Sequence, residues 1–264
     1  MRTTLRSLWN YRGFIIGSVR REFESKYRKS VLGATWNIVN PLAMILVYTI
    51  IFSQLMKARL PGVDKPFAYS IYLCAGTLTW GLFTEIVSRG QNIFIENANL
   101  LKKISFPRLI LPIILVLNAC INFLIISCLF LLFLIFSGNW PGWTLLNVVP
   151  LLAIELMLAI GMAMVLGVLN VFFRDVGQFV AIFLQFWFWL TPIVYPLEIL
   201  PPAVRSWMLW NPMFPVIQGY QNIFAGQPIA DWTAICIPVV MGGLLCLLGW
   251  RMFRTHSGEM VDEL

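Results

Sequence analysis

The stretch NANLLKKISFPR, residues 97–108, is a short polar and basic segment between two long apolar runs of the chain. The run before it covers residues 67–87 and the run after it covers residues 109–136. Each run supplies about the 20 residues that a helix needs to cross the hydrocarbon core of a bilayer. The segment is therefore predicted to lie at one face of a membrane, where it either fixes topology or meets a partner protein.

The composition excludes an ordinary soluble domain, because 59% of the residues are hydrophobic and only 12% are charged. The net charge of +7 is spread between the apolar runs, which favours membrane topology over nucleic-acid binding. Residues 1–33 are basic and polar and lack the apolar core of a cleavable signal. All five cysteines fall in apolar segments without metal-ligand spacing, so no metal site is expected.

The apolar runs predict an all-α membrane protein, because backbone groups in lipid must be paired within the segment. We expect six transmembrane helices, at residues 34–56, 67–87, 109–136, 144–170, 176–197 and 231–250.

The distribution of Lys and Arg gives the orientation. Of the 19 basic residues, the connections on one side hold only Lys57, Arg59, Lys65 and Arg205. By the positive-inside rule, both termini are expected in the cytoplasm. The predicted organisation is a cytoplasmic interface region at 1–33, a six-span domain at 34–250 and a cytoplasmic tail at 251–264.

Before the first span, Ile15, Val19, Phe23 and Tyr27 recur every fourth residue among charged ones. A helix with this pattern has one apolar stripe and one charged face. It either lies in the cytoplasmic membrane interface or packs on a partner.

The fifth run, QFWFWLTPIVYP at residues 185–196, contains Pro192, which should kink or end a helix. The residues that follow, up to Pro228, are too rich in proline for a full span and too apolar for a free loop. We expect a re-entrant pair of short helices that forms an extracytoplasmic gate, shielded by protein or lining a wet cavity. The aromatic residues here, Tyr220 among them, form either an interfacial belt or a channel surface on which sugar rings can stack. The candidate gate and channel residues are Trp187, Trp189, Pro192, Tyr195, Trp207, Trp210, Asn211 and Pro212.

Two carboxylates, Glu85 and Glu155, fall inside predicted spans and should face other helices or water. Glu155 is the deeper one, and it either bonds between spans or couples transport to protons. In the same span Ala159, Ala163 and Gly167 form a small-residue face that indicates close helix packing.

No enzyme site is visible. There is no GxxxxGK[ST] phosphate loop, no G-x-S-x-G and no HExxH. The acidic and histidine residues form no cluster that a membrane-embedded transferase would need. We therefore expect a transport subunit without catalytic residues and without a cofactor of its own.

Four motifs in order carry a resemblance that covers the whole chain. They are YRKSVLGATWNIVNPL at 27–42, NANLLKKISFPR at 97–108, NVFFRDVGQ at 170–178 and WNPMFP at 210–215. With them the chain resembles the permease subunits of ABC exporters for cell-surface polysaccharides, which serve O-antigen, capsule and teichoic acid.

The resemblance implies a homodimer in the bacterial inner membrane, paired with two ATP-binding cassette subunits that bind ATP and Mg. It implies a lipid-linked polysaccharide as substrate, usually O-antigen on undecaprenyl diphosphate. Arg28 and Lys29 are then expected to meet the diphosphate. The expected contacts with the ATPase are Asn97, Asn99, Leu101, Lys102, Lys103 and Arg108, with Arg174 and Asp175 as a second contact.

Other functions stay open at this point. They are a capsule or teichoic-acid exporter, an exporter of drugs or small lipids with the same frame, and an ion-driven transporter of small solutes that depends on Glu155. The motifs favour O-antigen over capsule.

Overall fold

The computed structural model describes residues 11–27, 35–55, 67–102, 108–227 and 232–264, and every regular element in these ranges is a helix. The membrane-length and apolar helices are α3 (Trp36–Tyr48), which continues as the π-helix η2 (Thr49–Leu55), α4 (Ala68–Gly90), α7 (Ile110–Phe136), α8 (Val148–Phe172), α9 (Asp175–Leu190) and α12 (Cys236–His256). The shorter elements are α2 (Arg12–Tyr27), α5 (Ile93–Glu96), α6 (Ala98–Leu101), η3 (Gly142–Asn147), η4 (Leu197–Ile199), α10 (Pro202–Met208), α11 (Met213–Phe224) and α13 (Glu259–Glu263).

A helix lies at each of the six predicted positions. Among the described residues, four helices are long and apolar enough to cross a membrane, namely α4, α7, α12 and the helix at 142–172 that η3 and α8 form together. The apolar helices at 38–52 and 175–190 are shorter. The all-helical membrane fold is confirmed, whereas crossing by the two shorter helices remains a prediction.

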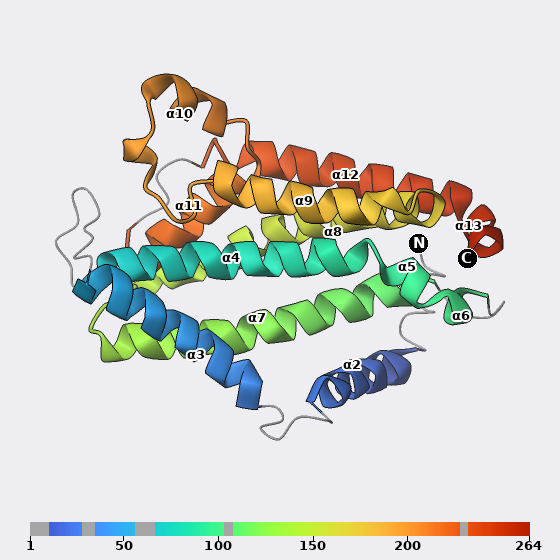
Figure 1. Cartoon of the computed structure of the whole chain (residues 1–264), viewed down its shortest axis with the longest axis horizontal. Helices are drawn as coiled ribbons and strands as arrows, with labels where there is room; N and C mark the ends of the chain where they lie inside the picture. Colours follow the sequence, from blue (N-terminus) through green and yellow to red (C-terminus); the bar gives the residue numbers. More distant parts are fainter. Residues whose placement is uncertain (1–10, 28–34, 56–66, 103–107, 228–231) are drawn as a thin grey trace.

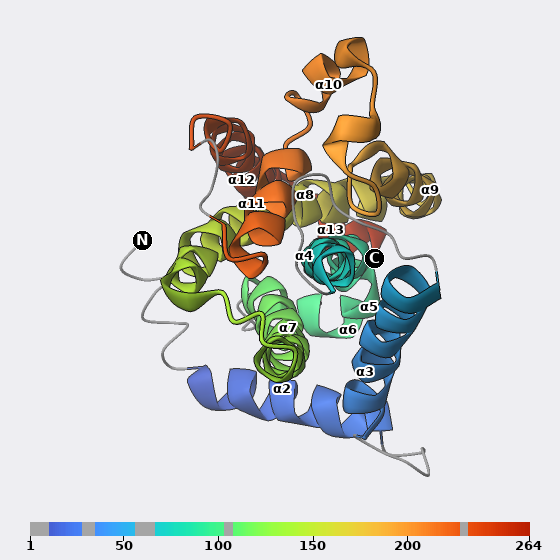
Figure 2. The same ribbon diagram turned by 90° about the vertical axis from the view of Figure 1, so that its left-hand side faces the viewer.

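The helix α4 lies at the centre of the molecule, with α3, α7, α8, α9 and α11 around it (Figure 2). Its residues Ala75, Phe83, Ile86 and Val87 are fully buried. The short helices α5, α6 and α13 lie at one end of the long helices, and α10 projects from the other end (Figure 1). The helix α4 therefore runs between the two ends of the molecule.

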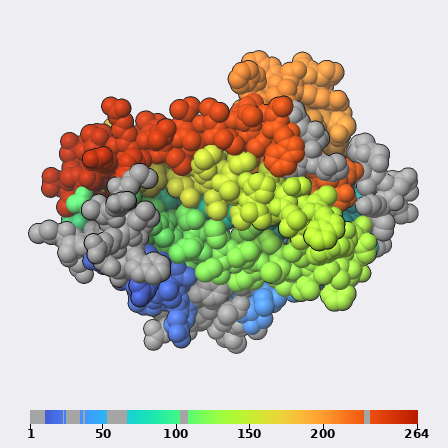
Figure 3. Space-filling model, turned by 180° about the vertical axis from the view of Figure 1, so that it is seen from behind, coloured from blue at the N-terminus to red at the C-terminus, as the bar shows by residue number. Residues whose placement is uncertain are grey.

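Small residues bring α8 close to its neighbours. A Cβ atom built on Gly90 of α4 would lie 2.5 Å from the Cβ of Ala163, and one built on Gly167 would lie 2.8 Å from the Gly90 oxygen. A Cβ on Gly161 would lie 2.7 Å from the backbone nitrogen of Cys246 in α12. Figure 3 shows α12 in red lying lengthwise beside α8 in yellow-green. The predicted small-residue packing is confirmed at Ala163 and Gly167.

Pro192 acts on α9 as predicted. The helix ends at Leu190, short of the predicted span end at residue 197, because Thr191 has the extended backbone that a following proline favours. The short helices η4, α10 and α11 follow it, and a re-entrant gate formed by this segment remains a prediction. In α11 most side chains are buried, including Met213, Val216 and Ile223.

A helix is present at the position predicted to be amphipathic, as α2, and it packs against α7, whereas its place in the membrane interface remains a prediction. Ile15 and Val19 of the predicted stripe are half-buried, together with Ser18 and Glu22, whereas Ile16 is 66% exposed. The side chains of Phe23 and Tyr27 lie outside the described part.

Candidate functional site

The predicted contact with a partner begins where α4 ends. The helices α5 and α6 follow it at the end of the molecule (Figure 1). The side-chain amide of Asn97 donates to the Ile93 oxygen over 2.9 Å and so fixes the turn between α5 and α6. Asn99 and Lys102 are exposed, whereas Leu101 is only 2% exposed. Leu101 therefore anchors α6 and the two polar residues provide surface, while Lys103 lies outside the described ranges.

The second predicted contact lies at the start of α9. Arg174 and Asp175 are exposed, as is Phe173 before them. Asp175 stands in the first turn of α9, where a negative charge stabilises the helix terminus. This short segment offers a cation, an anion and an aromatic ring to a partner.

Asn170 near the end of α8 joins these two contacts. Its side-chain amide donates to the Gln91 oxygen over 2.9 Å and to the Asn92 side-chain oxygen over 3.0 Å. Its side-chain oxygen accepts from the backbone N–H of Gly177 over 3.1 Å. Asn170 is buried, so the turn before α5 and the start of α9 are held as one unit.

The C-terminal segment packs against α5 and Arg108, a contact that was not predicted from the sequence. Arg108 donates to the Ser257 oxygen. The rings of Phe94 and Phe253 stack at 5.4 Å, and Met260 of α13 is 2% exposed. The helix α12 runs without a break into this segment and ends at His256.

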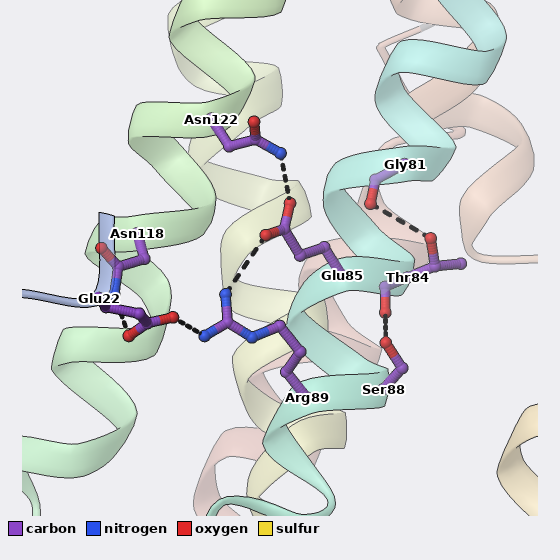
Figure 4. A network of polar contacts seen from close by, with 8 residues as sticks. All are labelled: Glu22, Gly81, Thr84, Glu85, Ser88, Arg89, Asn118 and Asn122. Atoms are coloured by element: carbon purple, nitrogen blue, oxygen red, sulfur yellow. Dashed lines mark hydrogen bonds and ion pairs between the residues drawn. The ribbon is translucent and has the colours of Figure 1, made fainter. Parts of the chain in front are cut away.

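A polar cluster joins α2, α4 and α7 near the end of α4, just before α5 (Figure 4). Arg89 of α4 forms ion pairs with Glu22 of α2 and with Glu85 of α4, the latter at 3.4 Å. From α7, Asn118 donates to Glu22, and Asn122 donates to Glu85 over 2.9 Å. Glu85 thus faces other helices, as predicted, and its charge is balanced by Arg89.

At the opposite end, Trp187 is a buried structural residue. Its indole N–H donates to the Asn211 side-chain oxygen over 2.9 Å, and the Asn211 amide donates to the Thr191 hydroxyl over 2.8 Å. Its ring packs edge-on against Trp80 and Phe83 of α4. The gate prediction included Trp187 as a channel residue, but in this conformation its ring lies inside the protein.

The other predicted gate residues divide into exposed and internal ones. Trp189, Trp207 and Trp210 are exposed, at 59%, 77% and 76%. Pro192 and Pro212 are buried. Tyr195 is half-buried and donates to the Trp189 oxygen over 2.8 Å.

The non-helical backbone after α9 finds partners on α4 and α11. Tyr72 donates to the oxygens of Pro192 and Tyr195, at 3.1 and 3.0 Å. Tyr69 donates to the Val194 oxygen over 2.8 Å, and Gln221 bonds the Ile193 oxygen over 3.3 Å. Side chains thus supply hydrogen bonds to the carbonyls of this non-helical segment, as the predicted re-entrant position would require.

Glu155 of α8 is fully buried, and neither carboxylate oxygen has a hydrogen-bond partner among the described residues. The Tyr220 hydroxyl of α11 is a polar neighbour. In the described ranges no group of three or more His, Cys, Asp or Glu side chains is placed to hold a metal ion.

Residues 15–225, from α2 to the end of α11, match the family described as ABC-2 type transporter. The chain belongs to this family. The matched region of this ABC-2 chain includes the amphipathic helix, both candidate contacts and the helices α10 and α11.

Relatives of this ABC-2 chain match it over nearly their full length. The O-antigen export system permease protein RfbA of Myxococcus xanthus is 30% identical, covering 98% of each chain. The protein of the same name from Klebsiella pneumoniae is 28% identical, covering 92% of each chain. The polysialic acid transport protein KpsM of Escherichia coli is 22% identical, covering 92% of this chain and 93% of its own.

Proposed function

We propose that this chain is the permease subunit of an ATP-driven exporter that moves a lipid-linked polysaccharide across the bacterial inner membrane. O-antigen on undecaprenyl diphosphate is the proposed substrate, and both termini face the cytoplasm. The observation that carries the proposal is the unit that Asn170 holds together, because it presents two exposed polar surfaces at one end of the central helix α4. The family and the names of the relatives support the same function.

The energy source in this proposal is a separate ATPase, since the sequence has no phosphate-binding loop. Two such subunits dock on α5, α6 and the start of α9 of a homodimer. The exposed apolar side chains of α9, which include Phe179, Ile182 and Phe186, suit either lipid or the second copy. Arg28 and Lys29 are proposed to meet the lipid diphosphate, although both lie outside the described residues.

In the proposed mechanism, closure of the ATPase dimer pushes on α5 and α6 and moves α4. The path between the two permease copies then widens, and the segment after Pro192 yields. A polymer is much longer than the membrane is thick, so stepwise movement through a continuous channel fits better than a single alternating-access cycle. The exposed rings of Trp189, Trp207 and Trp210 offer the sugar a stacking surface without a fixed site.

The proposal is tested by expressing the permease with its candidate ATPase and measuring co-purification and ATP hydrolysis in lipid. Reversing the charge at Lys102 and Lys103 should reduce hydrolysis and polymer export while the permease still purifies as a folded protein. Arg251→Glu is the matched control, because Arg251 is an exposed cation on α12 outside the contact segments. A permease that binds no ATPase, or a reversed variant that exports at the normal rate, would contradict the proposal.

Two other functions have an observation in their favour. The similarity to KpsM favours a capsule polymer, and chemical analysis of the glycan retained in a deletion strain decides between the two polymers. The buried, unpaired Glu155 favours an ion-coupled transporter of small solutes. Glu155→Gln should abolish transport in that case, whereas ATP-driven polymer export should survive this isosteric change.

A further inference from the structure

The contact between α2 and the rest of the protein includes an ion pair across helices, between Glu22 and Arg89. Glu22 of α2 points toward α4 and α7, where it meets Arg89 and Asn118 (Figure 4). Half-buried side chains of α2 beside it include Ile15, Ser18 and Val19. Glu22 adds a charged, directional contact to this packing.

Arg89 has a second carboxylate within reach. Glu85 lies one turn earlier on α4, and its carboxylate oxygen is 3.4 Å from a guanidinium nitrogen of Arg89. This separation is longer than a well-formed charge-assisted hydrogen bond. Both ion pairs are accessible to solvent, with Arg89 and Glu22 side chains 40% and 37% exposed. Arg89 can consequently leave Glu22 without losing its charge partner.

Glu22 and Arg89 also border a hollow of about 430 Å³ between α2 and the segment α5–α6. Ser18 and Glu22 of α2 line one part of it, and Glu96, Asn97 and Leu100 of the segment α5–α6 line another. Among its described lining residues, carboxylates outnumber the single guanidinium, so a phosphate group is not a fitting occupant. The hollow instead leaves room for α2 and α5–α6 to move relative to each other.

We propose that Glu22 is a latch that docks α2 onto the end of α4, and that Arg89 keeps Glu85 as its charge partner when α2 is released. Arg89 lies four residues before the first residue of α5, so a push on α5 and α6 reaches this contact directly. The role of the latch in transport rests on the proposed ATP-driven function. The docking of α2 does not depend on it.

Substitutions of the two carboxylates should have opposite effects on the docking of α2. This difference distinguishes a latch from an ordinary structural contact. Glu22→Gln removes the docked partner, so α2 should be released more often. Glu85→Gln removes the alternative partner of Arg89, so α2 should stay docked more often. Both substitutions keep the size of the side chain and an oxygen that can accept from Asn118 or Asn122.

The experiment is amide hydrogen exchange over residues 12–27, measured on the intact permease in lipid nanodiscs without the ATPase. A 16-residue helix depends on packing for much of its protection. Exchange should become roughly fivefold faster in Glu22→Gln, as expected for loss of a half-exposed ion pair. It should become slower in Glu85→Gln, and in both variants exchange over α12 should stay as in the native protein.

Unchanged exchange in Glu22→Gln would overturn the latch, and so would faster exchange in Glu85→Gln. If Glu22→Gln also loosens α12, the residue has a general structural role and the proposal fails. Adding Arg89→Gln to Glu22→Gln should speed exchange no further, because both changes remove the same ion pair, whereas two independent folding defects would add. Co-purification with the ATPase is scored separately, so the proposed function and the latch can fail independently.

Discussion

The side-chain amide of Asn170 donates to the main-chain oxygen of Gln91 over 2.9 Å, so a residue of α8 fixes the point where α4 turns toward α5. The side-chain oxygen of the same residue accepts from Gly177 of α9. The turn before α5 and the start of α9 are therefore both bonded to one residue of α8. In the proposed mechanism, this link lets two segments far apart in the sequence act as one contact surface.

Replacing Asn170 with alanine should uncouple these segments. The change leaves the buried Gln91 oxygen without this donor, which costs about 1–3 kcal/mol, and removes the acceptor of the half-buried Gly177 N–H, which costs less. We expect a lower thermal midpoint and fewer polymers exported per ATP hydrolysed. Thermal unfolding in detergent and export assays check the two effects.

Asn139→Ala is the control for this change. Asn139 bonds to Ser137, two residues away, and lies in the turn after α7, outside the segments that Asn170 joins. Its loss should leave the ratio of export to hydrolysis unchanged. Equal effects of the two substitutions would show that Asn170 has no special part in coupling.

Tyr72 should contribute more to the stability of the fold than one ordinary hydroxyl, because its hydroxyl bonds the oxygens of both Pro192 and Tyr195. Tyr72→Phe leaves two carbonyls of the non-helical segment without this donor, at a cost of about 1–3 kcal/mol. Tyr195→Phe removes a more exposed bond to the Trp189 oxygen and should cost less. Thermal midpoints of the two variants, measured side by side, test the difference. A larger loss in Tyr195→Phe would mean that the carbonyls after Pro192 find other partners.

Much of the helical frame could be predicted from the sequence, because apolar run length and proline position act locally. The end of α9 before Pro192 and the small residues Ala163 and Gly167 are examples. The orientation of side chains around each helix could not be predicted in the same way. In a membrane, the face toward lipid and the face toward the protein are both apolar, so Trp187 and Trp189 look alike in the sequence although one is buried and the other exposed.

The polar contacts between distant parts of the chain could not be predicted from the sequence either. Arg89 and Glu22 are 67 positions apart, and Arg108 and Ser257 are 149 apart. Nothing in the local pattern joins such residues. The i to i+4 spacing of Glu85 and Arg89 was the one local signal, and it indicates only that the two can pair on one helix.

Gly90→Ala should strain the contact between α4 and α8. The new methyl group would lie 2.5 Å from the Cβ of Ala163, so backbone must move, and overpacking of this kind costs about 1–3 kcal/mol. Adding Ala163→Gly removes the clashing atom and should restore most of the loss, apart from about 0.5–1 kcal/mol for glycine within a helix. A double-mutant cycle on thermal stability measures the coupling of the two sites. Additive losses would show that α4 and α8 are not in close contact there.

The exposed rings of Trp207 and Trp210 should matter for export and hardly at all for folding. Both project from the segment around α10, so replacing them with alanine should change the unfolding free energy by no more than about 0.5 kcal/mol. If sugars stack on these rings, the double variant should export polymer several-fold more slowly while ATPase binding stays normal. Trp187→Phe is the opposite case, because it removes the indole N–H bonded to Asn211 and should cost about 1 kcal/mol of stability. Export and co-purification with the ATPase, measured on the same preparations, distinguish the exposed tryptophans from the buried one. Normal export in the double variant would count against a sugar-contacting surface at α10. An equal loss of ATPase assembly would count against it as well.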